Sequence, residues 1–464
     1  MNTSPKHSKE LIRAALADGN LRAAVGKATG STVESRQKII DGIPYWEQLR
    51  EKVYSIKKDV IENLDKNLLL FEENCRKNNI TVHWAEDAGE AREIISGIAE
   101  KNGAKRIVKS KSLTTEEINL NNFLINKGIE TLETDLGEYI VQLNDQIPSH
   151  LIIPAMHLSR KDIGKLFSDK LGVPYTEEPA ELLKIARKIL REKFLNADIG
   201  ISGANFAFAS AGSFCIVENE ANAHLTISLP RIHIAVMGIE KLLPDIKLLP
   251  YFLKLLPPSA TGQKSSTYVN FIGGPTRQKY GEGPEEVHIV LLDNGRTKIL
   301  KDPELRETLF CIRCGACLNS CPVYKQIGGH SYGWVYMGPI GAALIPQYLG
   351  EAEGKHSPFL SSLCCACAEA CPAKINLPGH LLKLRNKIVE TKNNSMIERI
   401  GFKIYSSLLT RPLLYRILTK FPAFMQKFMP GGRPFPVPGY SGRREFTRFD
   451  PDGFRKRFFK MYDK

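Results

Sequence analysis

Eight of the ten cysteines in this 464-residue chain lie in two related stretches, Cys311-Ile-Arg-Cys314-Gly-Ala-Cys317-Leu-Asn-Ser-Cys321-Pro322 and Ser361-Ser-Leu-Cys364-Cys365-Ala-Cys367-Ala-Glu-Ala-Cys371-Pro372. The first has the spacing C-x2-C-x2-C-x3-C-P, and the second keeps it with serine where the leading cysteine would stand. Three thiolates on one tight turn can bind one iron–sulfur cluster, whereas the fourth, followed by proline, ligates a neighbouring cluster. The motifs therefore predict two clusters.

Zinc and disulfide bonds are the alternatives to iron–sulfur clusters. A structural zinc site normally takes paired C-x2-C units with four sulfurs in all, and it has no use for a trailing Cys-Pro. A disulfide framework is typical of small secreted chains, and the first ten residues lack the apolar stretch of a signal peptide. No window approaches the 18 or so apolar residues of a membrane span. We expect a cytoplasmic protein with cluster-binding thiols.

The crossed ligand rule assigns the cysteines to two clusters. The first cluster takes Cys311, Cys314, Cys317 and Cys371, and the second takes Cys321, Cys364 and Cys367. The fourth position of the second cluster is vacant in the sequence, so water, Ser361, Cys365 or a partner protein would complete it. We favour [4Fe-4S] for both clusters, with [3Fe-4S] as the alternative for the second. We expect Cys365 to be a spectator, because adjacent residues in a turn rarely point to the same iron.

Positive charge is concentrated at the end of the chain. The net charge is +14, and residues 385–464 contain 18 Lys and Arg against 6 Asp and Glu. Such a basic tail with interleaved aromatics suits docking to a partner protein, and a solvated tail is the plain alternative. Nucleic acid or a membrane surface is a weaker possibility, because no nucleic-acid motif accompanies the charge.

Strand and helix patterns alternate before the cysteine motifs. Strands are predicted at 80–84, 106–110, 130–135, 151–154, 232–237 and 287–292, and helices at 47–79, 88–102, 114–128 and 180–195. Residues 159–162 cap a further helix, and a loop begins at 257. This alternation predicts a mostly parallel sheet with helices on both faces. Helical patterns around the cysteines predict an α-helical dicluster ferredoxin module. The expected segments are an N-terminal helical segment (1–45), an α/β domain (46–295), the cluster domain (296–390) and a basic C-terminal region (391–464).

The α/β domain has one candidate anion site. Lys109, Ser110, Lys111 and Ser112 follow a predicted strand and precede a helix, whose N-terminus presents free amides. A carboxylate or phosphate would fit, and a turn with solvated lysines is the alternative. Further candidates near the strand ends are His157, Asn205, Glu218, Glu220 and His233. The sequence has no G-x-G-x-x-G nucleotide fingerprint and no H-E-x-x-H or G-x-S-x-G motif, so no catalytic residue is assigned.

The chain resembles the lactate utilization protein B family, iron–sulfur subunits of bacterial L-lactate oxidation. The resemblance lies in residues 108–118, 133–143, 148–157, 201–207 and 232–240, in both cysteine motifs and in the basic tail. One departure is Cys365, where the family more often has glycine. The resemblance implies an N-terminal LUD-type domain with an isomerase/CoA-transferase-like fold. It also implies two partner proteins, an iron–sulfur protein rich in Cys-Cys-Gly motifs and a small LUD-domain protein.

Two functions follow from these expectations. Oxidising lactate to pyruvate removes two electrons, whereas a cluster accepts one electron at a time. A non-catalytic electron-transfer subunit of a lactate-oxidising complex is therefore the first hypothesis. The alternative is an oxidoreductase in its own right, whose α/β domain binds a small hydroxy acid or a phosphate-bearing anion.

Overall fold

The computed structural model describes residues 8–276, 283–391, 396–428 and 453–462. The chain forms two compact units, Met1–Ile388 and Val389–Lys464. Within the described ranges no helix combines the length and the apolar character that crossing a bilayer requires.

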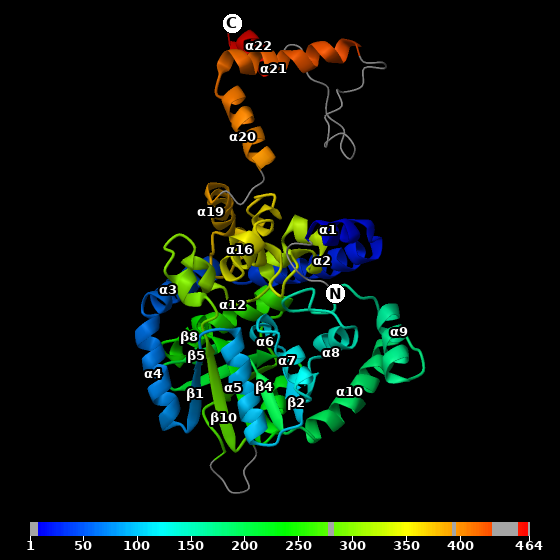
Figure 1. Cartoon of the computed structure of the whole chain (residues 1–464), viewed down its shortest axis with the longest axis vertical. Helices are drawn as coiled ribbons and strands as arrows, with labels where there is room; N and C mark the ends of the chain where they lie inside the picture. The colour runs from blue at the N-terminus through cyan, green and yellow to red at the C-terminus, as the bar shows by residue number, and fades with distance from the viewer. Residues whose placement is uncertain (1–7, 277–282, 392–395, 429–452, 463–464) are drawn as a thin grey trace. The chain divides into compact units, whose positions relative to one another are not determined.

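A six-stranded, wholly parallel sheet forms the centre of the first unit (Figure 1). Its strands, in spatial order, are β1 (Ile80–Ala85), β10 (Glu286–Leu292), β7 (Ile232–Gly238), β4 (Ile199–Ser202), β2 (Arg106–Lys109) and β3 (Glu130–Glu133). Every residue of β7 is buried, and Ala235 and Met237 face one hydrophobic cluster while Ile234 and Val236 face another. Burial on both faces explains its continuous apolar sequence.

Helices cover both faces of this sheet, as predicted. On one face lie α4 (Leu64–Lys77) and a four-stranded second sheet, in the order β8 (Leu242–Leu243), β5 (Phe206–Phe208), β6 (Ser213–Glu218) and β9 (Tyr268–Ile272). On the other lie α5 (Ala88–Lys101) and α7 (Leu120–Asn126). Further helices of the α/β domain include α6 (Leu113–Glu117), α8 (Leu136–Leu143), α9 (Arg160–Leu171), α10 (Pro179–Leu195) and α11 (Asn222–Ser228), with the 3-10 turns η2 (Ile239–Lys241) and η3 (Ile246–Leu248).

The cysteine motifs lie in a helical module that shares one hydrophobic core with the N-terminal helices. This module contains α13 (Arg296–Leu300), η4 (Arg306–Phe310), α14 (Ala316–Asn319), α15 (Pro322–Ile327), η5 (His330–Tyr332), α16 (Gly338–Tyr348), α17 (Glu351–Gly354), η6 (Ser357–Phe359), α18 (Ala366–Ala370) and α19 (Leu377–Glu390). The N-terminal helices are α1 (Ser8–Ala17), α2 (Gly19–Ile40) and α3 (Trp46–Glu62). Val25, Val53 and Leu318 all belong to the shared core, so the module does not stand apart from the rest of the first unit.

Four local predictions were wrong. The helix predicted at 114–128 is interrupted at Asn119, whose φ is 50°, between α6 and α7. The long helix predicted at 47–79 breaks at Asn63, between α3 and α4. Residues 151–154 form a turn instead of a strand, because Leu151 packs with the cysteine module. Pro257 lies within α12 (Leu249–Thr261) and does not begin a loop. The buried side chains of this helix outweigh the lost backbone hydrogen bond, and Gly262 ends the helix with a φ of 68°.

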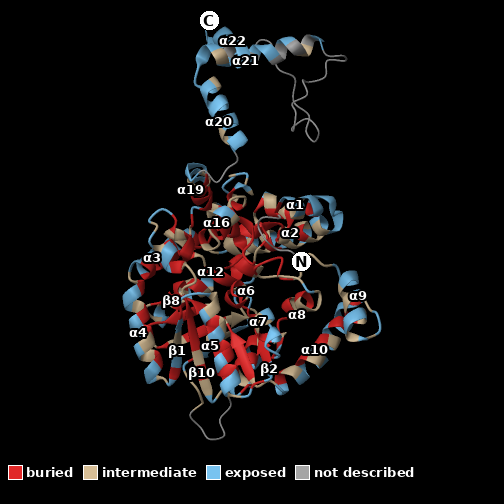
Figure 2. Cartoon of the chain, viewed as in Figure 1, coloured by how far each residue is buried: buried red, intermediate tan, exposed pale blue. Residues whose placement is uncertain are grey.

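The second unit contains α20 (Met396–Leu409), α21 (Pro412–Met425), η7 (Gln426–Phe428) and α22 (Gly453–Tyr462). None of the residues of α20 is buried, and Ile397 is 85% exposed. Phe402 and Leu413 are exposed as well. Figure 2 shows α20 and α21 mostly in the colour of exposed residues.

Candidate iron–sulfur centre and adjoining cavity

Four cysteines from the two motifs surround one small cavity. Cys311, Cys314, Cys317 and Cys371 line it together with apolar residues such as Leu151. Cys311 is half-buried, and the other three are buried. No disulfide joins them. Sulfur donors from both motifs at one apolar cavity fit an iron–sulfur cluster, whose ligand set the crossed rule predicts.

The remaining motif cysteines form a second group. Burial, and then the nearby sulfurs of Cys321 and Cys364, raise the pKa of the Cys367 thiol to about 12. Cys321 caps α15, and its sulfur accepts a hydrogen bond from the Tyr324 amide at 3.5 Å. Burial is the main cause that raises the pKa of Cys317, in the first group, well above its usual value. The nearby sulfur of Cys367 raises it further. The two groups therefore lie next to each other.

Positive backbone angles let each motif turn around its centre. Arg313 and Gly315 have φ angles of 61° and 75°. A Cβ atom at Gly315 would lie 3.2 Å from the ring of His150. Glycine therefore serves both the turn and the close packing against the α/β domain.

Cys365 occupies the position in the second motif that Gly315 has in the first. Its φ is 68°, its side chain is exposed, and its sulfur lies 3.7 Å from the carbonyl oxygen of Leu363. The Cys365 sulfur therefore contacts the backbone of its own turn.

Two arginines from the N-terminal helices hold the second motif. Arg36 Nη2 donates to the Ala370 carbonyl at 3.0 Å. Arg50 Nε donates to the Cys371 carbonyl at 3.0 Å, and its Nη2 donates to Ala368. Sequence reasoning missed these residues, because Arg36 and Arg50 look like ordinary charges on helix surfaces.

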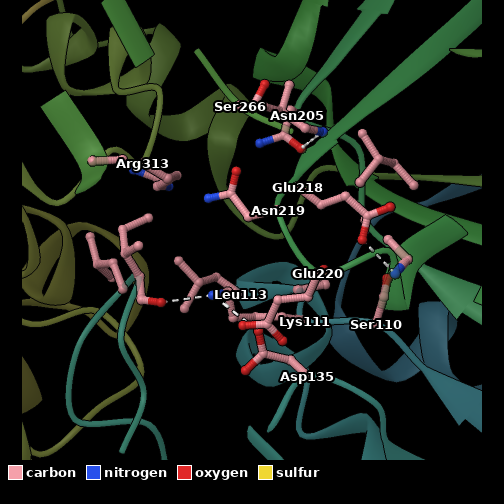
Figure 3. A pocket seen from close by; sticks show the side chains of 18 of the residues that line it. Ser110, Lys111, Leu113, Asp135, Asn205, Glu218, Asn219, Glu220, Ser266 and Arg313 are labelled. Atoms are coloured by element: carbon pink, nitrogen blue, oxygen red, sulfur yellow. Dashed lines mark hydrogen bonds and ion pairs between the residues drawn. The ribbon is translucent and has the colours of Figure 1, made fainter. Parts of the chain in front are cut away.

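A larger cavity of about 470 Å³ adjoins the first motif. One wall comes from the carboxyl ends of the parallel strands, where Ser110, Lys111 and Ser112 lie. The opposite wall includes Arg313, the residue next to Ile312 in the first motif (Figure 3). Ligands of open α/β sheets bind at this edge, and here the edge faces the cysteine module.

The predicted anion site divides between this cavity and the protein interior. Lys109 is fully buried, and its Nζ lies 2.6 Å from Glu133 and 2.9 Å from Glu116. Burial works against its charge, but these carboxylates raise its pKa above the usual value. Lys111 Nζ donates to the Ile152 carbonyl at 2.8 Å. Only Ser110, Lys111 and Ser112 of the four predicted residues line the cavity.

Charged groups line both sides of the cavity. Asp135 and Glu220 gather near Lys111, whereas Arg313 faces them from across the space (Figure 3). Lys241 also lines the cavity, and burial lowers its pKa to about 8. Within the described part of the chain, Arg313 Nη1 is buried without a hydrogen-bond partner. This donor belongs to a residue that lines the cavity.

A buried charge network joins the α/β domain to the cysteine module. Arg296 Nη2 lies 2.9 Å from Glu117, and its Nε lies 2.5 Å from Glu240. Glu240 also pairs with Arg313 at 3.5 Å. Burial favours the neutral form of Glu240, but the arginines outweigh it and lower its pKa to about 2. No sequence motif marks this network, since its members are far apart in the chain.

Most of the other candidate residues have structural partners. Asn205 accepts the Val217 amide, and Glu218 accepts the amides of Ala223 and His224. His157 lies within hydrogen-bond distance of Ser149 and Gln146. The buried His233 contacts Ser202 Oγ at 2.7 Å. Asn205, Glu218 and Glu220 line the cavity, and burial raises the pKa of Glu220.

Two family models match parts of this chain. Residues 68–292 match a family model described as the LUD domain, and residues 307–375 match one described as the 4Fe-4S dicluster domain. "Lactate utilization protein B" from Bacillus cereus (strain AH820) is 43% identical over 98% of this chain and 97% of its own. The protein of the same name from Bacillus thuringiensis (strain Al Hakam) gives the same values. A crystal structure of a DUF162 family protein from Deinococcus radiodurans covers 49% of this chain and 98% of its own, at 12% identity and a TM-score of 0.28.

The cofactor follows from the matched domain and from the donor set that the structure presents. The match over the cysteine module shows a 4Fe-4S dicluster domain, so iron–sulfur is the cofactor of this chain. The LUD domain match covers the parallel sheet and the helices on its faces. Because the relatives match along nearly the whole chain, the protein belongs to the lactate utilization protein B family, with a LUD domain followed by a 4Fe-4S dicluster domain.

Proposed function

We propose that this chain is the iron–sulfur electron-transfer subunit of a cytoplasmic assembly that oxidises L-lactate to pyruvate. The observation that supports this most is the pair of adjacent cysteine groups within a 4Fe-4S dicluster domain, in a chain related to lactate utilization proteins. Cys311, Cys314, Cys317 and Cys371 hold one cluster, and Cys321, Cys364 and Cys367 hold the other. Two adjacent clusters pass electrons singly along a short path.

The clusters supply one-electron chemistry, and side chains of this chain affect how readily the clusters are reduced. Oxidising lactate releases two electrons and two protons, so the dehydrogenation step belongs to a partner with a two-electron cofactor. Arg313 places positive charge beside the first cluster and favours its reduced, more negative state. The partners are the Cys-Cys-Gly-rich iron–sulfur protein and the small LUD-domain protein. The exposed apolar side chains of α20 and α21 suit docking to them.

Reconstitution tests this function. The isolated, anaerobically reconstituted chain is expected not to oxidise lactate with an artificial electron acceptor. When both partner proteins are added, lactate should bleach the cluster absorption of this chain. Turnover by the isolated chain would reject the electron-relay function and support the alternative, an oxidoreductase in its own right.

The cavity favours that alternative as the second candidate. It lies between the strand ends and the first cysteine motif, and it contains Lys241 and the unpaired donor of Arg313. A small hydroxy acid bound there would lie beside the first cluster. Isothermal titration of the full chain with lactate and with inorganic phosphate tests this candidate. Lys241→Met should weaken binding at least tenfold, whereas Lys254→Met, on the exposed surface of α12, should not.

A further inference from the structure

The two cysteine motifs are structural repeats, residue by residue. Leu363 has a φ of 56° and Cys365 a φ of 68°, matching 61° at Arg313 and 75° at Gly315. In each motif the second of these residues is the N-cap of a short helix, α14 or α18. Positive φ is unfavourable for residues other than glycine, so its recurrence at two matched positions shows that both loops have the same path. Each residue of the second motif therefore has a counterpart 50 positions earlier.

The repeat extends to the first position of each motif. Cys311 Sγ accepts a hydrogen bond from the amide of Arg313 at 3.4 Å. Ser361 Oγ accepts one from the amide of Leu363 at 3.1 Å. The two side chains thus have the same orientation relative to their loops. Since Cys311 lies at the first cavity with Cys314 and Cys317, Ser361 has the matching relation to Cys364 and Cys367.

Cys365 lacks this relation. It takes the place of Gly315, a position that has no side chain in the first motif. Its exposed sulfur contacts the carbonyl oxygen of Leu363. The loop geometry therefore favours Ser361, and not Cys365, as a ligand of the second cluster.

The surroundings of Ser361 suit an oxygen ligand. Arg385 Nη2 donates to the Ser361 carbonyl at 3.0 Å, and Arg385 Nε donates to the Pro358 carbonyl at 2.9 Å. These bonds hold the backbone and place a positive charge at the Ser361 carbonyl group. Ser361 is half-buried and Cys364 is exposed, so water can take the proton that the hydroxyl loses.

We propose that Ser361 Oγ is the fourth ligand of the second cluster and completes it as a four-iron cluster. An iron–oxygen bond forms, the hydroxyl proton leaves to water, and no electron is transferred. One iron of this cluster then has an oxygen donor, and the other three have Cys321, Cys364 and Cys367. This inference rests on the cluster assignment of the proposed function and is independent of the lactate reaction.

Mössbauer and EPR spectroscopy of the full chain, reconstituted anaerobically with iron-57, test the proposal. The first cluster serves as an internal reference in every sample. The wild type should contain a four-iron second cluster with one distinct iron site. Ser361→Cys should keep four irons and make that site resemble the other three. Ser361→Ala should lose one iron and show the EPR signal of an oxidised three-iron cluster.

A matched variant separates Ser361 from its neighbour. Cys365→Ala removes the extra thiol and should give the wild-type spectrum. The proposal is overturned by a three-iron cluster in the wild type, by an unchanged spectrum in Ser361→Ala, or by loss of the fourth iron in Cys365→Ala. Because the readout is spectroscopic, a failure here is distinguishable from a failure of lactate-dependent reduction.

Discussion

Arg313 of the first cysteine motif and Glu240 of the α/β domain pair at 3.5 Å in the protein interior. Arg313 also lies over the ring of Tyr336, with 4.6 Å between its Cζ atom and the ring centroid. Burial alone would lower the pKa of Arg313, but Tyr336 and Cys311 raise it well above the usual value. The cluster module and the cavity wall therefore share one permanent positive charge.

Removing this charge should change the redox potential of the first cluster. Arg313→Gln is expected to lower the midpoint potential, because reduction adds negative charge beside the side chain. Each 1.4 kcal/mol of lost interaction corresponds to about 59 mV for a one-electron couple. Arg313→Lys keeps the charge and should shift the potential less. Anaerobic redox titration followed by EPR measures both variants; equal shifts would show that charge is not the cause.

Cys371 should serve the first cluster in spite of its place in the second motif. Wild-type protein is expected to contain about seven or eight irons per chain, from two clusters. Cys371→Ser should damage the cluster of Cys311, Cys314 and Cys317 and leave the other spectrum largely intact. Iron analysis and EPR test this. Damage confined to the cluster of Cys364 and Cys367 would contradict the crossed assignment.

The basic C-terminal region should dock on partner proteins without supporting the first unit. A chain truncated after Val389 is expected to keep its cluster absorption, because the cysteines and their packing residues all lie before this point. It should fail to co-purify with the two partner proteins. Assembly that persists while cluster content is lost would instead make the region a structural cover.

Growth tests the relay in the cell. Cells with Cys317→Ser should fail to grow on L-lactate as sole carbon source and grow normally on pyruvate, which enters after the blocked step. A strain with Lys111→Met, grown in parallel, tests whether growth on lactate depends on the cavity of the α/β domain. Normal growth of the Cys317→Ser strain on lactate, without a second lactate dehydrogenase, would reject the electron-relay function.

Acid should destabilise the first unit through its buried histidines. Burial lowers the pKa of His233 to about 3, whereas an unfolded histidine titrates near 6.5. Between these values the unfolded chain binds a proton that the folded chain does not, so stability falls as the pH falls below about 6.5. The loss is about 1.4 kcal/mol per such histidine at pH 5.5. Circular dichroism of urea unfolding should show a smaller loss between pH 7.5 and 5.5 in His233→Gln.

Much of the fold is predictable because its signals are local. The apolar run at 232–237 and the α/β alternation predict a buried parallel strand and helices on both faces, and the structure confirms both. The errors at 151–154 and at Pro257 have one cause. Their hydrophobic residues are buried by segments distant in sequence, and this burial outweighs the local preference for a strand or a loop.

The sequence by itself determined the cofactor class, because cluster binding depends on short spacings between cysteines, which can be read directly from the sequence. The tertiary structure alone decided what surrounds those cysteines. It brought Arg50 to the Cys371 carbonyl, paired Glu240 with Arg313, and showed that Ser361 faces its loop as Cys311 does. Such contacts join residues that no periodicity relates, because they arise only when separate elements bury their apolar faces in one core.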